Sequence, residues 1–149
     1  MSEMRFAYPI EIRAMTEEEG GGFLVEFPDW NGAVTDGADV AEAMENARDC
    51  LDEMIAYHIR QRLPFPAPSA AGNRSLVTPE AGIALKAALW LGLCEHGMDP
   101  EALAERLGDV SGRDIERLLN PRLKTHPEPI QRALAALGKR IMVELADAA

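Results

Sequence analysis

The spacing of apolar residues changes once along this chain, near Asp39. Before that point, residues 8–13 alternate between apolar and polar side chains and residues 23–27 form a short apolar run. Both patterns are typical of β-strands. After Asp39, apolar residues recur every three or four positions up to Ile59, which is the period of a helix that buries one face. The change predicts an α+β protein whose strands come first.

The N-terminal strands and the helix after them have recognisable limits. We expect strands over residues 5–14, 23–27 and 33–35, with a hairpin turn at Gly20-Gly21-Gly22. The helix begins after the N-cap Asp39 and runs to about residue 62, because Pro64 cannot continue it. It should cover one face of the three-stranded sheet, and residues 75–78 could add a short returning strand.

Four shorter helices are expected in the second half, each with its own start and stop residues. The first begins after Thr78 and ends at Gly97, and the second has the N-cap Asp99 and ends at Gly108. The third begins after Ser111, with a capping box completed by Asp114, and the fourth covers residues 127–138. Residues 139–145 fit either a strand or a further helical turn. We place the domains at residues 1–78 and 79–149.

Two of these helices, in residues 100–119, have the layout of a helix-turn-helix. Apolar residues occupy the back of the second helix, while its front carries two arginines, a glutamate and an asparagine. In the DNA major groove, arginine reads guanine, asparagine reads adenine and glutamate can accept from cytosine. The basic residues that follow can reach phosphates. The candidate DNA contacts are Ser111, Arg113, Glu116, Arg117, Asn120, Arg122, Lys124 and Thr125. The alternative is a helical bundle with solvated charges.

The net charge of −10 is unevenly divided. Residues 1–66 carry fourteen acids and five arginines, a net −9, whereas residues 106–140 carry eight bases and four acids, a net +4. A basic window suits nucleic acid, and an acidic half suits a basic partner. The two halves are therefore expected to meet different partners.

The carboxylates Glu11, Glu26, Asp29 and Asp36 offer the main argument for an enzyme, a Mg²⁺-dependent nuclease. Glu11 and Glu26 occupy strand positions that face solvent, and Asp29 and Asp36 lie in turn sequences that favour aspartate. The three histidines are scattered, and no nucleophile–base pair or phosphate loop is present. We therefore expect no enzyme activity, no catalytic residue, no metal and no cofactor. No apolar run is long enough to cross a membrane, which predicts a cytoplasmic protein.

The segment FLVEFPDWNGAVTDG followed by ADVAEAMENARDCL resembles the N-terminal module of HicB-family type II antitoxins. The C-terminal stretch with RLLNPRLKTHPEPIQRALAALGKRI resembles the Xre/Cro-like helix-turn-helix of many members. The resemblance implies a β-β-β-α-β module of degenerate ribonuclease H-like fold, followed by an all-α helix-turn-helix domain. It also implies a small, basic, mRNA-cleaving HicA-like toxin as partner and a homodimer, or a larger homo-oligomer, that represses its operon on double-stranded DNA.

Candidate toxin contacts are Glu26, Asp29 and Trp30, the last in a turn expected to be exposed. The alternatives are a stand-alone transcriptional regulator of helix-turn-helix type and, with less support, a Mg²⁺-dependent ribonuclease H-like nuclease.

Overall fold

A computed structural model describes residues 4–147. The chain forms two compact units, each built from two pieces of sequence. The first unit contains the residues up to Ile55 together with Pro66–Glu80. The second contains Ala56–Phe65 and everything from Ala81 onward. The fold is mixed, with an N-terminal strand module followed by helices, as the change of period predicts.

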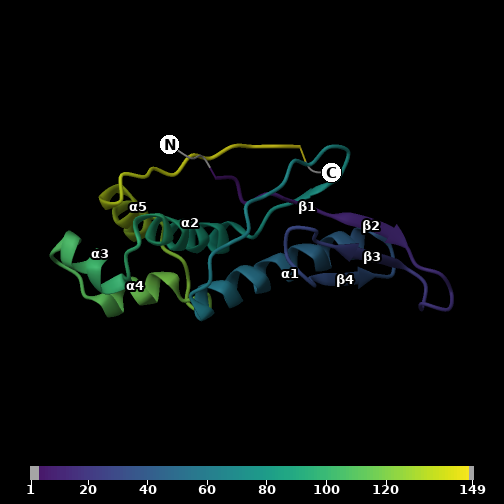
Figure 1. The fold of residues 1–149 in the computed structure, drawn as a ribbon, viewed down its shortest axis with the longest axis horizontal. Helices are drawn as coiled ribbons and strands as arrows, with labels where there is room; N and C mark the ends of the chain where they lie inside the picture. The colour runs from purple at the N-terminus through teal and green to yellow at the C-terminus, as the bar shows by residue number, and fades with distance from the viewer. Residues whose placement is uncertain (1–3, 148–149) are drawn as a thin grey trace. The chain divides into compact units, whose positions relative to one another are not determined.

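The first unit holds two small antiparallel sheets. Strands β2 (Glu11–Ala14), β3 (Phe23–Glu26) and β4 (Val34–Gly37) pair in the order β2-β3-β4 (Figure 1). Strands β1 (Tyr8–Pro9) and β5 (Leu76–Val77) form the other sheet, with Tyr8 opposite Val77. The returning strand expected at residues 75–78 therefore exists, but it pairs with β1.

The single first strand expected over residues 5–14 is wrong, because this segment forms β1 and β2 in two different sheets. The change of partner falls at Ile10, whose N–H donates to the carbonyl of Ser75 at 3.0 Å. Pro9 has no N–H to give to a ladder, so a regular pairing is interrupted beside it. Alternation of side chains indicates an extended chain without indicating which strand it pairs with.

Helix α1 (Val40–Gln61) begins where the sequence predicts. The N–H of Glu42 donates to Asp39 Oδ1 at 2.8 Å, and the Glu42 carboxylate accepts from Ala38 N–H at 3.0 Å. The alanines and leucine of its apolar stripe are fully buried, as is Val25 of β3, so helix and sheet share a core. Val40 belongs to the stripe by spacing but is 49% exposed, because it occupies the first position of the helix.

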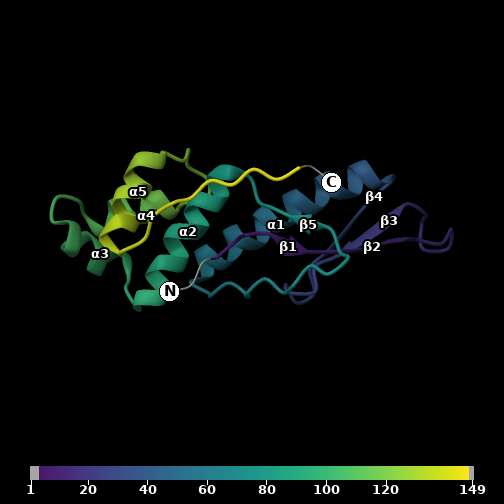
Figure 2. The same ribbon diagram turned by 90° about the horizontal axis from the view of Figure 1, so that it is seen from above.

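The second unit is helical. It contains α2 (Ala81–His96), α3 (Pro100–Leu107), α4 (Gly112–Leu119) and α5 (Pro127–Ala136), visible together in Figure 2. Its core combines large side chains with at most 1% exposure from all four helices, namely Leu89, Leu93, Leu103, Ile115 and Ile130. The four expected helices are confirmed.

Helix α2 starts at Ala81, two residues later than its proline and glutamate suggest. The N–H of Glu80 donates to Asp52 Oδ1 at 2.9 Å, so a side chain from α1 takes a donor that the helix would otherwise leave unsatisfied. At its other end, Gly97 is left-handed and Met98 N–H donates to the carbonyl of Leu93 at 3.0 Å. This is a Schellman ending, which the glycine predicts.

The end of the described chain forms neither a strand nor a helical turn, so both expectations for residues 139–145 are wrong. Its apolar side chains point into solvent: Met142 is 71% exposed and Leu145 is 94% exposed. Among residues 4–147 this apolar segment pairs with no strand, and a strand without a partner is not stable. Within residues 4–147, no helix is both long and apolar enough to span a bilayer.

Candidate nucleic-acid interface

Helices α3 and α4 have firmly defined starts. Asp99 Oδ1 accepts from the N–H of Ala102 at 2.8 Å, and Pro100 occupies the first helical position. At α4, Ser111 and Asp114 form a reciprocal capping box, with Ser111 N–H donating to the Asp114 carboxylate at 2.8 Å. This N–H holds the pKa of Asp114 below its usual value, since it stabilises the ionised form. The capping residues thus set where α4 begins and which residues it exposes.

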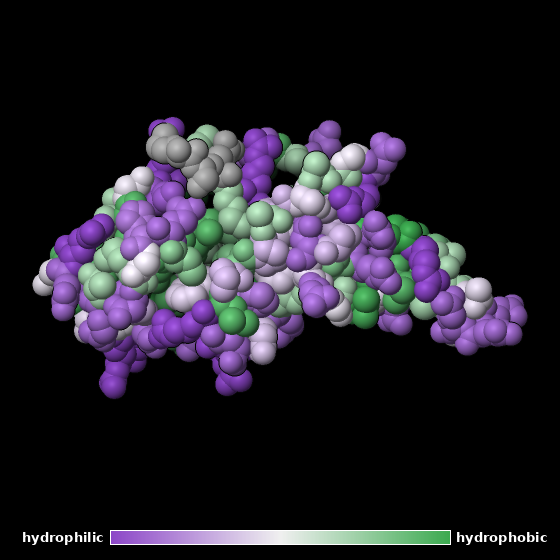
Figure 3. All heavy atoms as spheres, in the orientation of Figure 1, coloured by the Kyte–Doolittle hydropathy of each residue, from purple (hydrophilic) through white to green (hydrophobic). Residues whose placement is uncertain are grey.

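Helix α4 divides cleanly into a buried and an exposed side. Ile115 and Leu119 are at most 5% exposed. On the opposite side the four residues proposed to face DNA are all exposed, namely Arg113, Glu116, Arg117 and Asn120. Hydrophilic side chains gather over the surface of α3 and α4 on the face drawn in Figure 3. The face expected from the spacing of these residues therefore exists.

Three of the four acids in the basic window, residues 106–140, accept hydrogen bonds from other residues of the second unit. Asp109, in the turn between α3 and α4, accepts from Arg132 of α5 at 2.5 Å, and this arginine lowers the Asp109 pKa. Asp114 belongs to the capping box, and Glu116 accepts from the guanidinium of Arg62. Three of the four acids in the window are therefore already bound to donors.

Four basic side chains remain exposed in and just after α4. They are Arg113, Arg117, Arg122 and Lys124, and within the part of the chain that the structure describes none of them belongs to an ion pair. The structure thus places four exposed cations on one helix and the loop after it, beside the acids Asp114 and Glu116, which accept hydrogen bonds from Ser111 and Arg62. Such a cluster can take several phosphate oxygens of a duplex.

Other predicted DNA contacts have internal partners. The Oδ1 of Asn120 accepts from the N–H of Arg122 at 2.9 Å, and the hydroxyl of Thr125 donates to the carbonyl of Gly82 at 3.3 Å. The Ser111 hydroxyl belongs to the capping box. These three side chains therefore shape the segment around α4, and of the three interactions that of Asn120 engages only its Oδ1.

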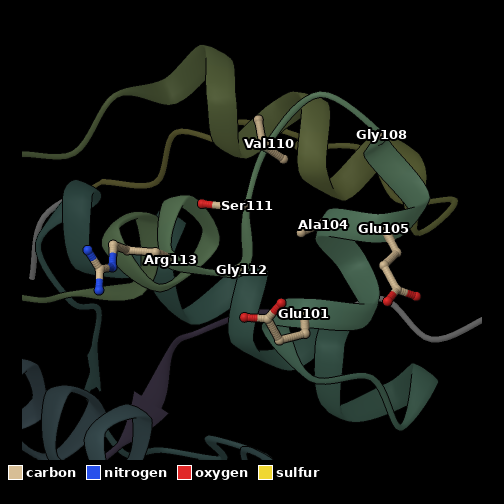
Figure 4. A pocket seen from close by; sticks show the side chains of 8 residues that line it. All are labelled: Glu101, Ala104, Glu105, Gly108, Val110, Ser111, Gly112 and Arg113. Atoms are coloured by element: carbon tan, nitrogen blue, oxygen red, sulfur yellow. The ribbon is translucent and has the colours of Figure 1, made fainter.

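The start of α4 lines an open hollow of about 600 Å³ at the α3–α4 turn (Figure 4). Glu101 and Glu105 stand on its rim, and Arg113 points away from them. A Cβ at Gly112 would lie 2.0 Å from Glu101 Oε1, so the carboxylate already covers the first turn of α4. A carboxylate there complements the positive end of the helix dipole and disfavours phosphate at that point.

Arg62 is a residue that the charge analysis missed. It lies in the acidic segment 1–66, yet in the structure it belongs to the second unit and contacts the exposed face of α4. Nothing in its local sequence distinguishes it from Arg60. Only the folded chain brings residues 54 positions apart into one ion pair.

The proposed toxin contacts have different environments. Glu26 is exposed on β3, directly opposite Glu11 of β2, and Asp29 accepts from the N–H of Ser69 at 2.9 Å. The expectation that Trp30 lies exposed is wrong: it is 3% exposed and packs edge-on against Tyr8 with ring centroids 5.1 Å apart. A turn sequence indicates polar backbone, but a large aromatic ring in it can still fold inward.

The four carboxylates considered for a nuclease lie in the first unit, on β2, β3, β4 and the turn after β3. Asp36 is exposed, as are Glu11 and Glu26, and Arg74 lies 3.8 Å from the Glu11 carboxylate. Within residues 4–147, no three or more His, Cys, Asp or Glu side chains are grouped in a way that could hold a metal ion.

Comparison with known proteins identifies the family. A model of the HicB-like antitoxins of bacterial toxin–antitoxin systems matches residues 7–88. Antitoxin HicB of Escherichia coli K12 is 31% identical over 136 residues, covering 90% of this chain and 95% of the relative. Antitoxin HicB of Pseudomonas fluorescens Pf0-1 is 30% identical over 144 residues, 94% of each chain. Antitoxin HicB 2 of Photorhabdus laumondii is 31% identical over 134 residues, 90% and 92% of the two chains. The chain belongs to the HicB-like antitoxin family.

Proposed function

We propose that this protein is the antitoxin of a type II toxin–antitoxin system that neutralises a small HicA-like mRNA-cleaving toxin and represses its own operon. The observation that carries the second half of the proposal is the set of exposed cations on and after α4 that have no ion pair among residues 4–147, namely Arg113, Arg117, Arg122 and Lys124. Membership of an antitoxin family supports the first half. The proposed role is non-enzymatic and needs no cofactor.

The toxin-binding function is assigned to the N-terminal module, residues 1–78, for which we propose a degenerate ribonuclease H-like fold. A ribonuclease must carry positive charge to hold RNA, and the net −9 of residues 1–66 would attract it. Glu26 and Asp29 are the proposed contacts, with the exposed Glu26 the stronger of the two. Trp30 would act by supporting the turn that presents Asp29, because its own ring is buried.

The DNA-binding function is assigned to residues 79–149, with α3 and α4 as a helix-turn-helix and α4 as its recognition helix. Arg113 and Arg117 would contact bases, and Arg122 and Lys124 would contact phosphates. Asn120 can supply a further base contact, whereas the Glu116 carboxylate accepts from Arg62. A homodimer is proposed because helix-turn-helix proteins of this kind read paired half-sites.

Co-expression with the small basic protein encoded beside this gene tests the toxin-binding half. We expect the two proteins to co-elute in size exclusion as one stoichiometric complex at micromolar concentration, and the complex to weaken as salt is raised. The test variant is Glu26→Lys, which reverses an exposed charge on β3 and should weaken the complex. Its matched control is Glu128→Lys on α5, which should not. Separate elution of the wild-type proteins would refute the toxin-binding half.

A further inference from the structure

The residue that follows helix α1 is an arginine in a backbone conformation that favours glycine. Arg62 has φ of 57°, and it is the one non-glycine residue with positive φ in the described chain. Its N–H donates to the carbonyl of Ile59 at 3.2 Å, and Leu63 N–H donates to the carbonyl of His58 at 2.9 Å. These two bonds define a Schellman ending, in which the left-handed position is usually glycine because a Cβ is disfavoured there. An arginine at this position therefore has a cost in folding free energy relative to glycine.

The contact made by that side chain lies on the proposed DNA-binding face. Arg62 Nη2 donates to Glu116 Oε1 of α4. Both side chains are about half exposed, at 50% and 53%, and ion pairs at such exposure contribute little to stability. Folding stability therefore does not account for an arginine at a glycine-type position.

The charges on α4 give a reason for an arginine at this position. Glu116 is exposed one turn after Arg113 and next to Arg117, so it places a negative charge among the cations proposed to meet DNA. A duplex presents two phosphate charges per base-pair step, and an uncompensated carboxylate facing it would be repelled. The guanidinium of Arg62 cancels that charge, and it uses one of five N–H donors in doing so.

We propose that Arg62 is a positioning residue of the DNA-binding surface, which holds and neutralises Glu116 so that α4 can approach the phosphate backbone. This inference rests on the proposed DNA-binding function. It assigns to that surface a residue from the end of α1, in a segment whose overall charge would repel DNA.

The first test compares Arg62→Gln with Arg60→Gln. Arg60 is exposed in the last turn of α1, carries the same charge, and has no ion pair among residues 4–147. The probes are a duplex spanning the sequence upstream of the protein's own gene and a random-sequence duplex of equal length. Arg62→Gln should weaken binding to both by about three- to tenfold, because the effect is electrostatic, while Arg60→Gln stays within about twofold.

A double-mutant cycle then tests the route of the effect. In the Glu116→Gln background no carboxylate remains to be neutralised, so adding Arg62→Gln should cause no loss beyond that of Arg60→Gln. Arg62→Gly provides a second variant that favours the left-handed backbone. It should keep or raise Tm while losing DNA affinity as Arg62→Gln does.

Three results would overturn the inference while the proposed function stands. In the first, the wild-type protein binds DNA and Arg62→Gln weakens binding no more than Arg60→Gln does. In the second, Arg62→Gln causes the same loss of affinity in the Glu116→Gln background as in the wild type. In the third, Arg62→Gly lowers Tm in parallel with its loss of affinity. If the wild-type protein binds neither duplex in gel shift or fluorescence anisotropy, the DNA-binding half of the proposed function fails, and this inference fails with it.

Discussion

At the scale of single residues, the polar side chains around α4 fall into two groups. Some cap helices or form ion pairs within the second unit, and others are exposed and available for binding. Ser111, Asp114 and Asp109 are all engaged in caps or ion pairs, while Arg113 and Arg117 extend from α4 without an ion pair among the described residues. The capping residues were predictable because their signal is local: an acceptor three residues from the donor it satisfies. The Arg62–Glu116 pair was not, since its members are 54 residues apart.

Arg113→Ala and Arg117→Ala should each weaken binding to the operator by roughly 1–3 kcal/mol, because each removes a bidentate base contact in the proposed complex. Binding to random DNA should fall less, by the electrostatic loss of one positive charge alone. Fluorescence anisotropy at one fixed salt concentration with both duplexes measures the difference. Equal losses on the two duplexes would show that these arginines contact phosphates only.

At the scale of elements, two glycines lie where an added Cβ would collide with a neighbouring helix. A Cβ at Gly37, at the end of β4, would lie 2.3 Å from the backbone N of Ala43 in α1. A Cβ at Gly112, at the start of α4, would lie 2.0 Å from Glu101 Oε1, which is the end of a flexible side chain. Backbone cannot yield without moving a whole element, whereas a carboxylate can rotate away. We therefore expect a Cβ to be tolerated at Gly112 and not at Gly37.

Gly37→Ala is therefore expected to destabilise the protein by about 1–3 kcal/mol, the cost of overpacking against fixed atoms. Gly112→Ala should stay within about 1 kcal/mol of wild type, since the loss of the Glu101 contact with the helix dipole is partly offset by better helix propensity. Urea unfolding of both variants measures the two values. Similar losses would mean that Glu101 is as immobile as the α1 backbone.

At the scale of the whole molecule, the charge of the chain is divided unevenly between an acidic N-terminal half and a basic window at residues 106–140. The whole-chain value of −10 suggests poor affinity for DNA, yet the second unit contains the window of net +4 at residues 106–140, to which Arg62 adds a further positive charge. Affinity for random DNA should remain weak, because the rest of the chain is acidic. In the proposed function, specific binding would therefore depend on a second copy that contributes its own α4.

A dimer should protect an inverted repeat whose half-site centres lie about 10 base pairs apart, or a multiple of that distance. DNase footprinting of the upstream region, with stoichiometry from analytical ultracentrifugation, measures this arrangement. The Arg113→Ala/Arg117→Ala variant serves as a control, since it should lose the footprint and still bind the toxin. A footprint over one isolated half-site by a single chain would contradict the dimer.

The sequence by itself determined the order of strands and helices and the ends of most helices, because periodicity and capping are set by residues a few positions apart. It also determined the exposed face of α4, since a helix fixes which side chains share a side. Tertiary structure decided the pairing of β1 with β5, the burial of Trp30 and the contact of Arg62 with Glu116. Each of these depends on which distant segments come together, and that choice is made by the packing of the whole unit rather than by any local pattern.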